Sequence, residues 1–390
     1  MRVKQSWLFF FLAIGILAFF FYRSYQPHLT YTLAEQFDGN DYAQAYAYFT
    51  GLEKDYEVAP PFHQRILIPW MASRLHSNII SDFQVINLLF TVLSIWMTFM
   101  LWRRLGFEFK WMLFGFVWLI FHWTGLIRLN AFDPITVDVA LYFFEALLLW
   151  ILLERKFKWL LWLAPLATAQ KESFLGFMVV LCIYAIWQNR KEQDEYFDTK
   201  VILMSTALAI ATKVGIEQIF TPSYEGRGAL VMIAYQVKQT LLNPFKLIRW
   251  AAAASMAFGP LLWLAMRNYQ RHFYWDNKRN LLALFTVISL GYGLLAGGDT
   301  TRIIFLGFPF IMSFAISEIQ TSKIRLEWVA IASLPLMMLP FTIPDPAYAW
   351  QQWQQWYPEF AEAWITLTVV NCTLFAGGIL LLLATRKENT

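Results

Sequence analysis

Residues 83–102 read FQVINLLFTVLSIWMTFMLW, a stretch without a single charged side chain. About 20 apolar residues in a helix are enough to cross the hydrocarbon core of a bilayer. Comparable stretches lie at 7–22, 112–127, 137–153, 201–220, 251–266, 281–297, 303–316, 328–341 and 365–383. The stretch therefore predicts a membrane helix, and its recurrence predicts an all-α, polytopic membrane protein.

The composition of the 390-residue chain excludes an ordinary soluble protein. Hydrophobic residues make up 58% and charged residues 15%, against about 45–50% and about 25% in soluble domains. The net charge of +4 is small and scattered, so we expect no nucleic-acid partner. Cys182 and Cys372 lie in apolar stretches, which argues against disulfides and cysteine-based metal sites.

One longer apolar stretch, 159–187, is interrupted by the polar sequence Gln170-Lys171-Glu172-Ser173. Both flanks are basic, and Lys and Arg collect in cytoplasmic loops. Two short helices in a hairpin would keep both flanks inside and put the polar tip outside. We therefore predict about twelve membrane helices, two of them short, in a single transmembrane domain spanning 1–390.

The distribution of the Lys and Arg residues over the two sides sets the predicted orientation. With the N-terminus inside, the cytoplasmic segments hold most of them, so both chain ends are expected in the cytoplasm. The loop 23–82 is then extracytoplasmic, as are two segments expected to lie at the interface, 221–249 and 344–364. The second contains Trp350, Trp353 and Trp356 at spacing three, which is typical of an interfacial helix.

Charged residues converge on the predicted outer face from four separate parts of the chain. The first is the loop 23–82, and the second runs from Arg128 to Asp138. The third is the Lys171-Glu172 tip, and the fourth is Asp299 with Arg302. Charges at a membrane boundary are costly unless they are paired or functional, so this convergence predicts a site. The histidines have no partner spacing for metal ligation, and we expect no metal and no cofactor. The alternative is a divalent cation held by Asp38 and Asp41.

Two motifs in the first loop carry a family resemblance. Residues 35–42 read EQFDGNDY, and residues 60–70 read PPFHQRILIPW. The pattern aromatic-Asp-Gly-x-x-Tyr followed by Gln-Arg-Ile-Leu-x-Pro resembles bacterial membrane proteins of the GT-C glycosyltransferase superfamily. Its Asp-Gly-x-x-Tyr part is similar to the first luminal loop of GPI mannosyltransferases.

The resemblance implies a GT-C-like fold and an inverting sugar transfer on the outer face of a bacterial inner membrane. The donor would be a polyprenyl-phosphate-linked sugar held among membrane lipids, and the acceptor a hydroxyl of a lipid, glycan or protein. Such a transfer needs a carboxylate to take the acceptor proton and cations to stabilise the leaving phosphate.

The resemblance also implies roles for individual residues. Asp38 is the candidate base, and Asp41 is a second carboxylate or the base itself. The candidate phosphate-binding residues are Arg65, Arg128, Lys171 and Arg302. The candidate supporting residues are Tyr42, Gln64, Asp133, Glu172 and Asp299, with Glu172 expected to orient or pair with one of the cations.

Simpler interpretations stay open beside these roles. Asp38 can cap a helix over 42–49, Arg65 can anchor the chain at the interface, and Lys171 and Glu172 can neutralise each other. Glu145 and Lys213, inside predicted spans, are expected to be partners of each other or of backbone. The alternative functions are a transporter or lipid flippase and a non-catalytic GT-C-like subunit.

Overall fold

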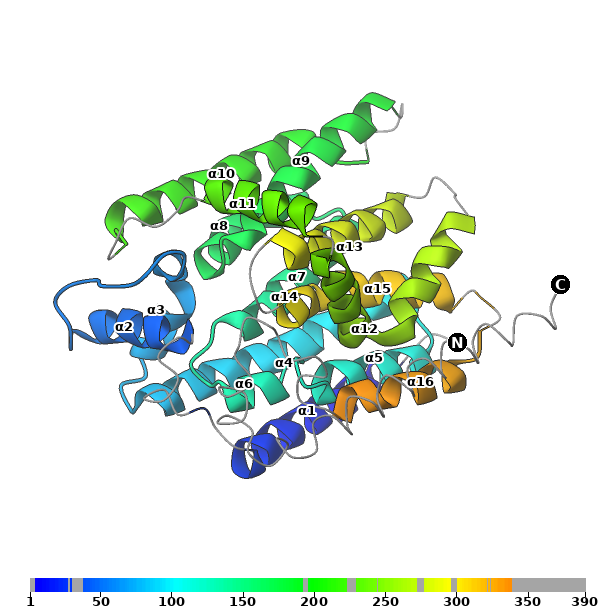
Figure 1. Ribbon diagram of the computed structural model, residues 1–390, viewed down its shortest axis with the longest axis horizontal. Helices are drawn as coiled ribbons and strands as arrows, with labels where there is room; N and C mark the ends of the chain where they lie inside the picture. The colour runs from blue at the N-terminus through cyan, green and yellow to red at the C-terminus, as the bar shows by residue number, and fades with distance from the viewer. Residues whose placement is uncertain are drawn as a thin grey trace. The chain divides into compact units, whose positions relative to one another are not determined.

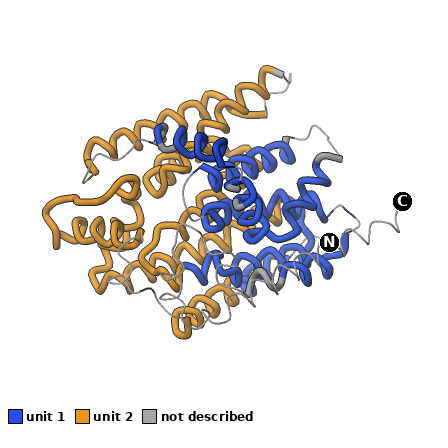
Figure 2. The backbone as a smooth tube through the Cα atoms, in the orientation of Figure 1, with its two compact units in different colours: residues 1–11, 105–129, 228–390 blue, residues 12–104, 130–227 orange. Residues whose placement is uncertain are grey.

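The computed structural model describes residues 4–26, 29, 38–191, 196–222, 229–243, 245–271, 277–295, 300–320, 322 and 324–338. Every regular element in these ranges is a helix, which confirms the all-α prediction (Figure 1). The chain packs as two compact units (Figure 2). Unit 1 comprises 1–11, 105–129 and 228–390, and unit 2 comprises 12–104 and 130–227.

Unit 2 contains the first-loop motifs. It holds α2 (Asp38–Thr50), η1 (Phe62–Gln64), α3 (Leu67–Ser73), α7 (Asp138–Leu153), η2 (Phe157–Trp159), α8 (Leu160–Gln170), α9 (Ser173–Lys191) and α10 (Thr199–Ile219). Most of α1 (Ser6–Tyr25) and α4 (Ile79–Leu105) also belongs to it. The helix α10 packs along both α8 and α9, and α2 packs on α3.

Unit 1 contains the helices of the second half of the chain. These are α5 (Phe109–Phe121), α11 (Ala229–Leu242), α12 (Phe245–Arg271), α13 (Asn277–Leu295), α14 (Thr300–Leu306), α15 (Phe308–Ile319) and α16 (Leu326–Met338). The short α6 (Arg128–Phe132) runs from unit 1 into unit 2. The segment 221–249 includes α11, whereas 344–364 lies outside the described residues.

Five helices in the described ranges are long and apolar enough to cross a membrane. They are Ser6–Tyr25, Ile79–Leu105, Ser173–Arg190, Thr199–Ile219 and Lys246–Tyr269. These helices are consistent with an integral membrane protein. The total of twelve stays a prediction, since 365–383 lies outside the described residues and α5 and α7 are shorter than these five.

Two predicted spans are not straight helices. The span 303–316 is bent by 70° where α14 meets α15 at Gly307. Pro309 lies in the first turn of α15, where a proline is tolerated because its missing N–H would have no helical partner. The span 251–266 is kinked inside α12 at Gly259, whose φ of 59° and ψ of −154° are followed by Pro260.

The predicted break in 159–187 is present. The helix α8 ends at Gln170, Lys171 is extended with φ −157° and ψ 125°, and α9 begins at Ser173. Only α8 is short, because α9 is long enough to cross a membrane by itself. The hairpin prediction of two short helices is therefore wrong for the second helix.

Candidate functional site

The candidate site begins at the first turn of α2. This helix starts at Asp38, four residues before the predicted start, and carries Asp38 and Asp41 in its first turn. Acidic side chains are favourable there because the helix dipole places partial positive charge at the N-terminus. Asp38 thus lies inside the helix, whereas the capping interpretation placed it ahead of the first turn.

The helix α2 is held by its buried face. Tyr42, Ala45 and Tyr46 are buried, and the Tyr46 hydroxyl donates to Asp82 Oδ2 at 2.8 Å. On the more exposed side, Asp41 Oδ1 accepts from the backbone N–H of Ala59 at 3.0 Å. The contact with Ala59 holds Asp41 beside the segment that leads into η1.

Asp41 is electrostatically coupled to Asp38. Burial raises the pKa of Asp41 above its ordinary value of 3.8, and the negative charge of Asp38 raises it further. The N–H of Ala59 and the charge of Arg65 oppose this shift. A raised pKa makes Asp41 a better proton acceptor than an ordinary aspartate once it is ionised.

Arg65 is the centre of the polar network. It is 8% exposed, and its Nη1 donates to the Tyr42 hydroxyl at 2.7 Å. Its Nε and Nη2 donate to the two oxygens of Glu172 at 2.9 and 2.7 Å. Burial alone would raise the pKa of Glu172, but the charge and hydrogen bonds of Arg65 hold it below 4.5. Glu172 therefore pairs with one of the candidate cations, as its supporting role implied.

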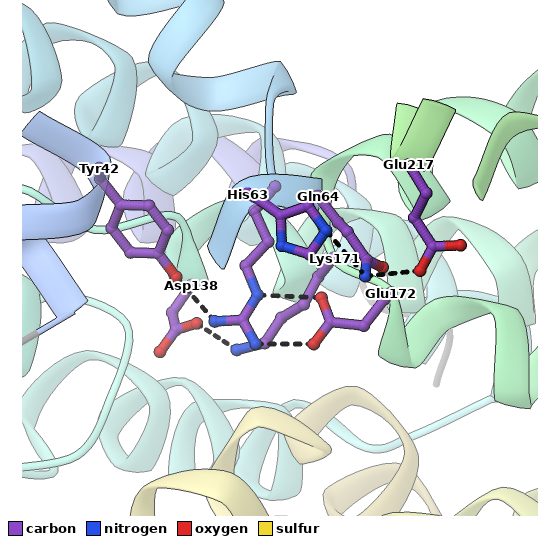
Figure 3. A network of polar contacts seen from close by, with 8 residues as sticks. Tyr42, His63, Gln64, Asp138, Lys171, Glu172 and Glu217 are labelled. Atoms are coloured by element: carbon purple, nitrogen blue, oxygen red, sulfur yellow. Dashed lines mark hydrogen bonds and ion pairs between the residues drawn. The ribbon is translucent and has the colours of Figure 1, made fainter. Parts of the chain in front are cut away.

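Lys171 pairs with a different element. Its Nζ donates to Asp138 Oδ1 at 2.5 Å, and both residues are buried. Successive side chains of an extended backbone point to opposite sides, so Lys171 and Glu172 reach separate partners. The direct partners of Lys171 and Glu172 are thus on other elements, although the charge of Lys171 also acts on Glu172. Figure 3 shows the contact of Lys171 with Asp138 as a dashed line.

A second branch of the network joins η1 to α10. Gln64 Nε2 donates to Glu217 Oε1 at 2.9 Å and lies 3.4 Å from His63 Nε2 (Figure 3). Lys213 Nζ donates to the same Glu217 oxygen at 2.5 Å. The expected pairing of Glu145 with Lys213 is therefore wrong, since Lys213 has its partner one helical turn away.

Sequence reasoning missed His63 and Glu217. The i, i+4 spacing of Lys213 and Glu217 was the signal for their pair. His63 stands inside the quoted motif, next to Gln64 and Arg65. Its burial and its place beside the contact of Gln64 with Glu217 depend on the fold and have no signal in the sequence.

The remaining candidates are Asp133, Arg128, Arg302 and Asp299. Asp133 is buried in unit 2. Arg128 and Arg302 belong to unit 1, where the Arg128 guanidinium lies 5.0 Å from the centre of the Trp123 ring. Asp299 lies outside the described residues. The network of unit 2 thus contains Tyr42, Gln64, Arg65, Lys171 and Glu172, and the charge of Asp38 acts on Asp41, Tyr42 and Arg65.

The network is close to electrically balanced. Arg65 faces Glu172, Lys171 faces Asp138, and Lys213 faces Glu217. Arginine has five N–H donors, and the bonds of Arg65 to Tyr42 and Glu172 use one on Nε and one on each terminal nitrogen. One N–H on each terminal nitrogen is not used by these bonds, and Tyr42 and Glu172 fix the plane of the guanidinium. Across the described ranges, no three His, Cys, Asp or Glu residues are grouped so that they could hold a metal ion.

Comparisons of the chain with protein-family models, curated proteins and solved structures found no match.

Proposed function

We propose that this protein is a membrane glycosyltransferase of GT-C-like fold. It moves a sugar from a polyprenyl-phosphate donor to an acceptor hydroxyl on the extracytoplasmic face, in a bacterial inner membrane. The observation that carries the proposal is the coupled pair of acids at the start of α2, beside the buried guanidinium of Arg65. A proton acceptor and a fixed cation are the two groups that this reaction needs.

The proposed reaction is one displacement at the anomeric carbon. The carboxylate of Asp38 or Asp41 takes the proton of the acceptor hydroxyl, whose oxygen forms the new bond to the anomeric carbon. The bond from that carbon to the phosphate oxygen breaks, and polyprenyl phosphate leaves with the electron pair. The anomeric configuration is inverted, because the acceptor enters opposite the leaving group.

The buried cation suits the leaving group. Tyr42 and Glu172 hold Arg65 in place, so its remaining N–H groups need no reorganisation when charge develops on the phosphate. Burial raises the pKa of Tyr42 well above 10, and the phenol therefore keeps its proton as a further donor. Lys171 contributes through its pair with Asp138, which fixes the start of α9.

A row of buried polar groups favours transport as a second candidate function. Glu145 is 1% exposed, and its Oε2 has no hydrogen-bond partner among the described residues. The buried hydroxyls of Thr91, Ser94 and Thr98 also lack a hydrogen-bond partner among the described residues. These three residues follow one face of α4 at spacings of three and four. Polar groups within a membrane helix commonly mark a path for ions or substrates.

One assay separates the two functions. The purified protein in lipid nanodiscs is mixed with a panel of polyprenyl-phosphate sugars and acceptor lipids, and products are followed by mass spectrometry. A glycosyltransferase will release polyprenyl phosphate and form a glycosylated acceptor. Movement of the intact donor across the bilayer of proteoliposomes, with no release of polyprenyl phosphate, would overturn the proposed function in favour of transport.

A further inference from the structure

His63 and Gln64 each bury an atom that lacks a hydrogen-bond partner. These atoms are His63 Nδ1 and Gln64 Oε1, and no partner for either is found in the described part of the chain. His63 itself is 4% exposed. A buried polar atom left unpaired costs about 1–3 kcal/mol, so such atoms commonly have a ligand or water as partner.

The neighbours of these two residues identify which atom donates and which accepts. The Glu217 carboxylate accepts from Gln64 Nε2, so Gln64 Oε1 is the remaining acceptor. The same amide nitrogen faces His63 Nε2, which makes Nε2 the acceptor of the ring and puts the ring proton on Nδ1. The two unpaired atoms are thus one donor and one acceptor, on the residues labelled in Figure 3.

Charges of both signs act on His63. Glu217 and Glu172 are negative, and Lys213 and Arg65 are positive. Burial lowers the pKa of His63 below its ordinary 6.5, and the ring is neutral at pH 7. A neutral donor and a neutral acceptor match a hydroxyl group, which can accept from one and donate to the other.

The position of His63 and Gln64 in the sequence indicates which hydroxyl-bearing ligand they bind. His63 and Gln64 directly precede Arg65, whose N–H groups face the donor phosphate in the proposed function. In a lipid-linked sugar, one glycosidic oxygen joins the sugar to the phosphate. Residues 63–65 are therefore suited to contact the two neighbouring parts of a single donor molecule.

We propose that His63 Nδ1 and Gln64 Oε1 form a subsite that binds hydroxyl groups of the donor sugar. The subsite rests on the proposed function for its choice of ligand. It is a binding site for a neutral polyhydroxylated group, distinct from the cations and from the acids of α2.

Four variants test the subsite in the nanodisc assay. His63→Phe removes the donor, Gln64→Met removes the acceptor, and the double variant removes both. His63→Asn is the matched control, because its amide N–H can stand near the position of ring Nδ1. The expected result is a KM for the donor about 10-fold higher in His63→Phe and in Gln64→Met, with kcat within about two-fold in both. In His63→Asn the KM should stay near normal.

A purely structural role would give a different pattern. His63→Phe removes the unpaired Nδ1 together with Nε2, whose contact with Gln64 is long at 3.4 Å, so its unfolding temperature should change little. Lower unfolding temperature in His63→Phe, with KM unchanged in both single variants, would overturn the subsite.

Binding of free sugars separates the subsite from the catalytic proposal. Methyl glycosides of glucose, mannose, galactose and N-acetylglucosamine are tested by saturation-transfer NMR. Binding that is lost in His63→Phe, without turnover of any donor, would support the subsite and count against the proposed function. Turnover with unchanged KM in His63→Phe and Gln64→Met would overturn the subsite and leave the function standing. The absence of both sugar binding and donor turnover would overturn the subsite and the proposed function together.

Discussion

Arg65 and Glu172 form a two-point ion pair although they are 107 residues apart in the sequence. Nε and Nη2 of the guanidinium meet the two carboxylate oxygens at 2.9 and 2.7 Å. The pair ties the end of η1 to the turn between α8 and α9. Because Lys171 next to it binds Asp138, the same turn is also fixed to the start of α7.

Glu172→Gln is expected to destabilise the protein strongly. The side chains of Arg65 and Glu172 are 9% and 23% exposed, so the substitution leaves a buried guanidinium without its counter-ion. We expect a loss of about 3 kcal/mol in the free energy of unfolding. Unfolding is monitored by tryptophan fluorescence in detergent. The control is Glu154→Gln, which breaks the more exposed pair with Arg104 and should cost less than about 1 kcal/mol. Equal losses in the two variants would contradict the structural role of the Arg65 pair.

The pH dependence of stability should contain a contribution from Glu172. Its pKa is lower in the folded protein than its ordinary 4.5, so the folded state binds this proton less tightly than the unfolded state. The stabilisation is therefore complete above pH 4.5 and is lost as the pH falls through the folded pKa. The pKa of Asp41 is raised in the folded protein, so its contribution to stability changes with pH in the opposite direction.

The difference between wild type and Glu172→Gln isolates this contribution. Unfolding midpoints of both proteins are measured from about pH 7 to about pH 3. The difference between the two unfolding midpoints should be constant down to pH 4.5 and should become smaller below it. A gap that stays constant through the acid range would show that the ion pair makes no pH-dependent contribution.

Gly259→Ala is expected to destabilise α12. The φ of 59° and ψ of −154° at Gly259 lie in a region that is essentially limited to glycine, and a Cβ there costs about 1–3 kcal/mol. Gly215→Ala in α10 is the matched control, because no atom beyond the neighbouring residues and backbone of its own helix lies within 4 Å of the added Cβ. Alanine at that helical position should stabilise by up to about 1 kcal/mol. The unfolding temperatures of both variants are compared with that of the wild type. A shift in the same direction for both variants would contradict the prediction.

The orientation of the first loop can be tested by cysteine labelling. Leu52 is 77% exposed beyond the end of α2, and Lys158 is exposed in η2, which we expect on the cytoplasmic side. In a background without Cys182 and Cys372, an impermeant maleimide should label Leu52→Cys in right-side-out vesicles. Lys158→Cys should react only in inverted vesicles. The reverse pattern would place the acids of α2 in the cytoplasm and refute the predicted topology.

The elements that follow from local chemistry could be predicted from the sequence. Residues 83–102 lie inside α4, and the polar interruption at 170–173 does separate α8 from α9. Both depend on hydropathy and on helix-breaking polar residues over a few neighbouring positions. The bend at Gly307 and the kink at Gly259 were missed, because apolar stretches read as continuous even where glycine and proline change the backbone.

The partners within the site were harder to predict. Glu172 was expected to pair with a cation, but no local pattern selects Arg65 over the other cations. Lys171 and Asp138 are 33 residues apart, and their contact depends on how α7 and α8 pack. The neighbouring positions of Lys171 and Glu172 suggested a mutual pair, and the extended backbone at Lys171 separates them.

The most direct test of the glycosyltransferase proposal is the rate of polyprenyl-phosphate release by Asp38→Asn, Asp41→Asn and the double variant. The amide introduced by Asp41→Asn keeps an oxygen that can accept from Ala59, so the substitution preserves this loop contact while removing the base. Loss of the base should slow the release by about 10²–10⁴-fold in one single variant and in the double variant, with Glu154→Gln unaffected. Release at the wild-type rate in the double variant would contradict the proposed mechanism.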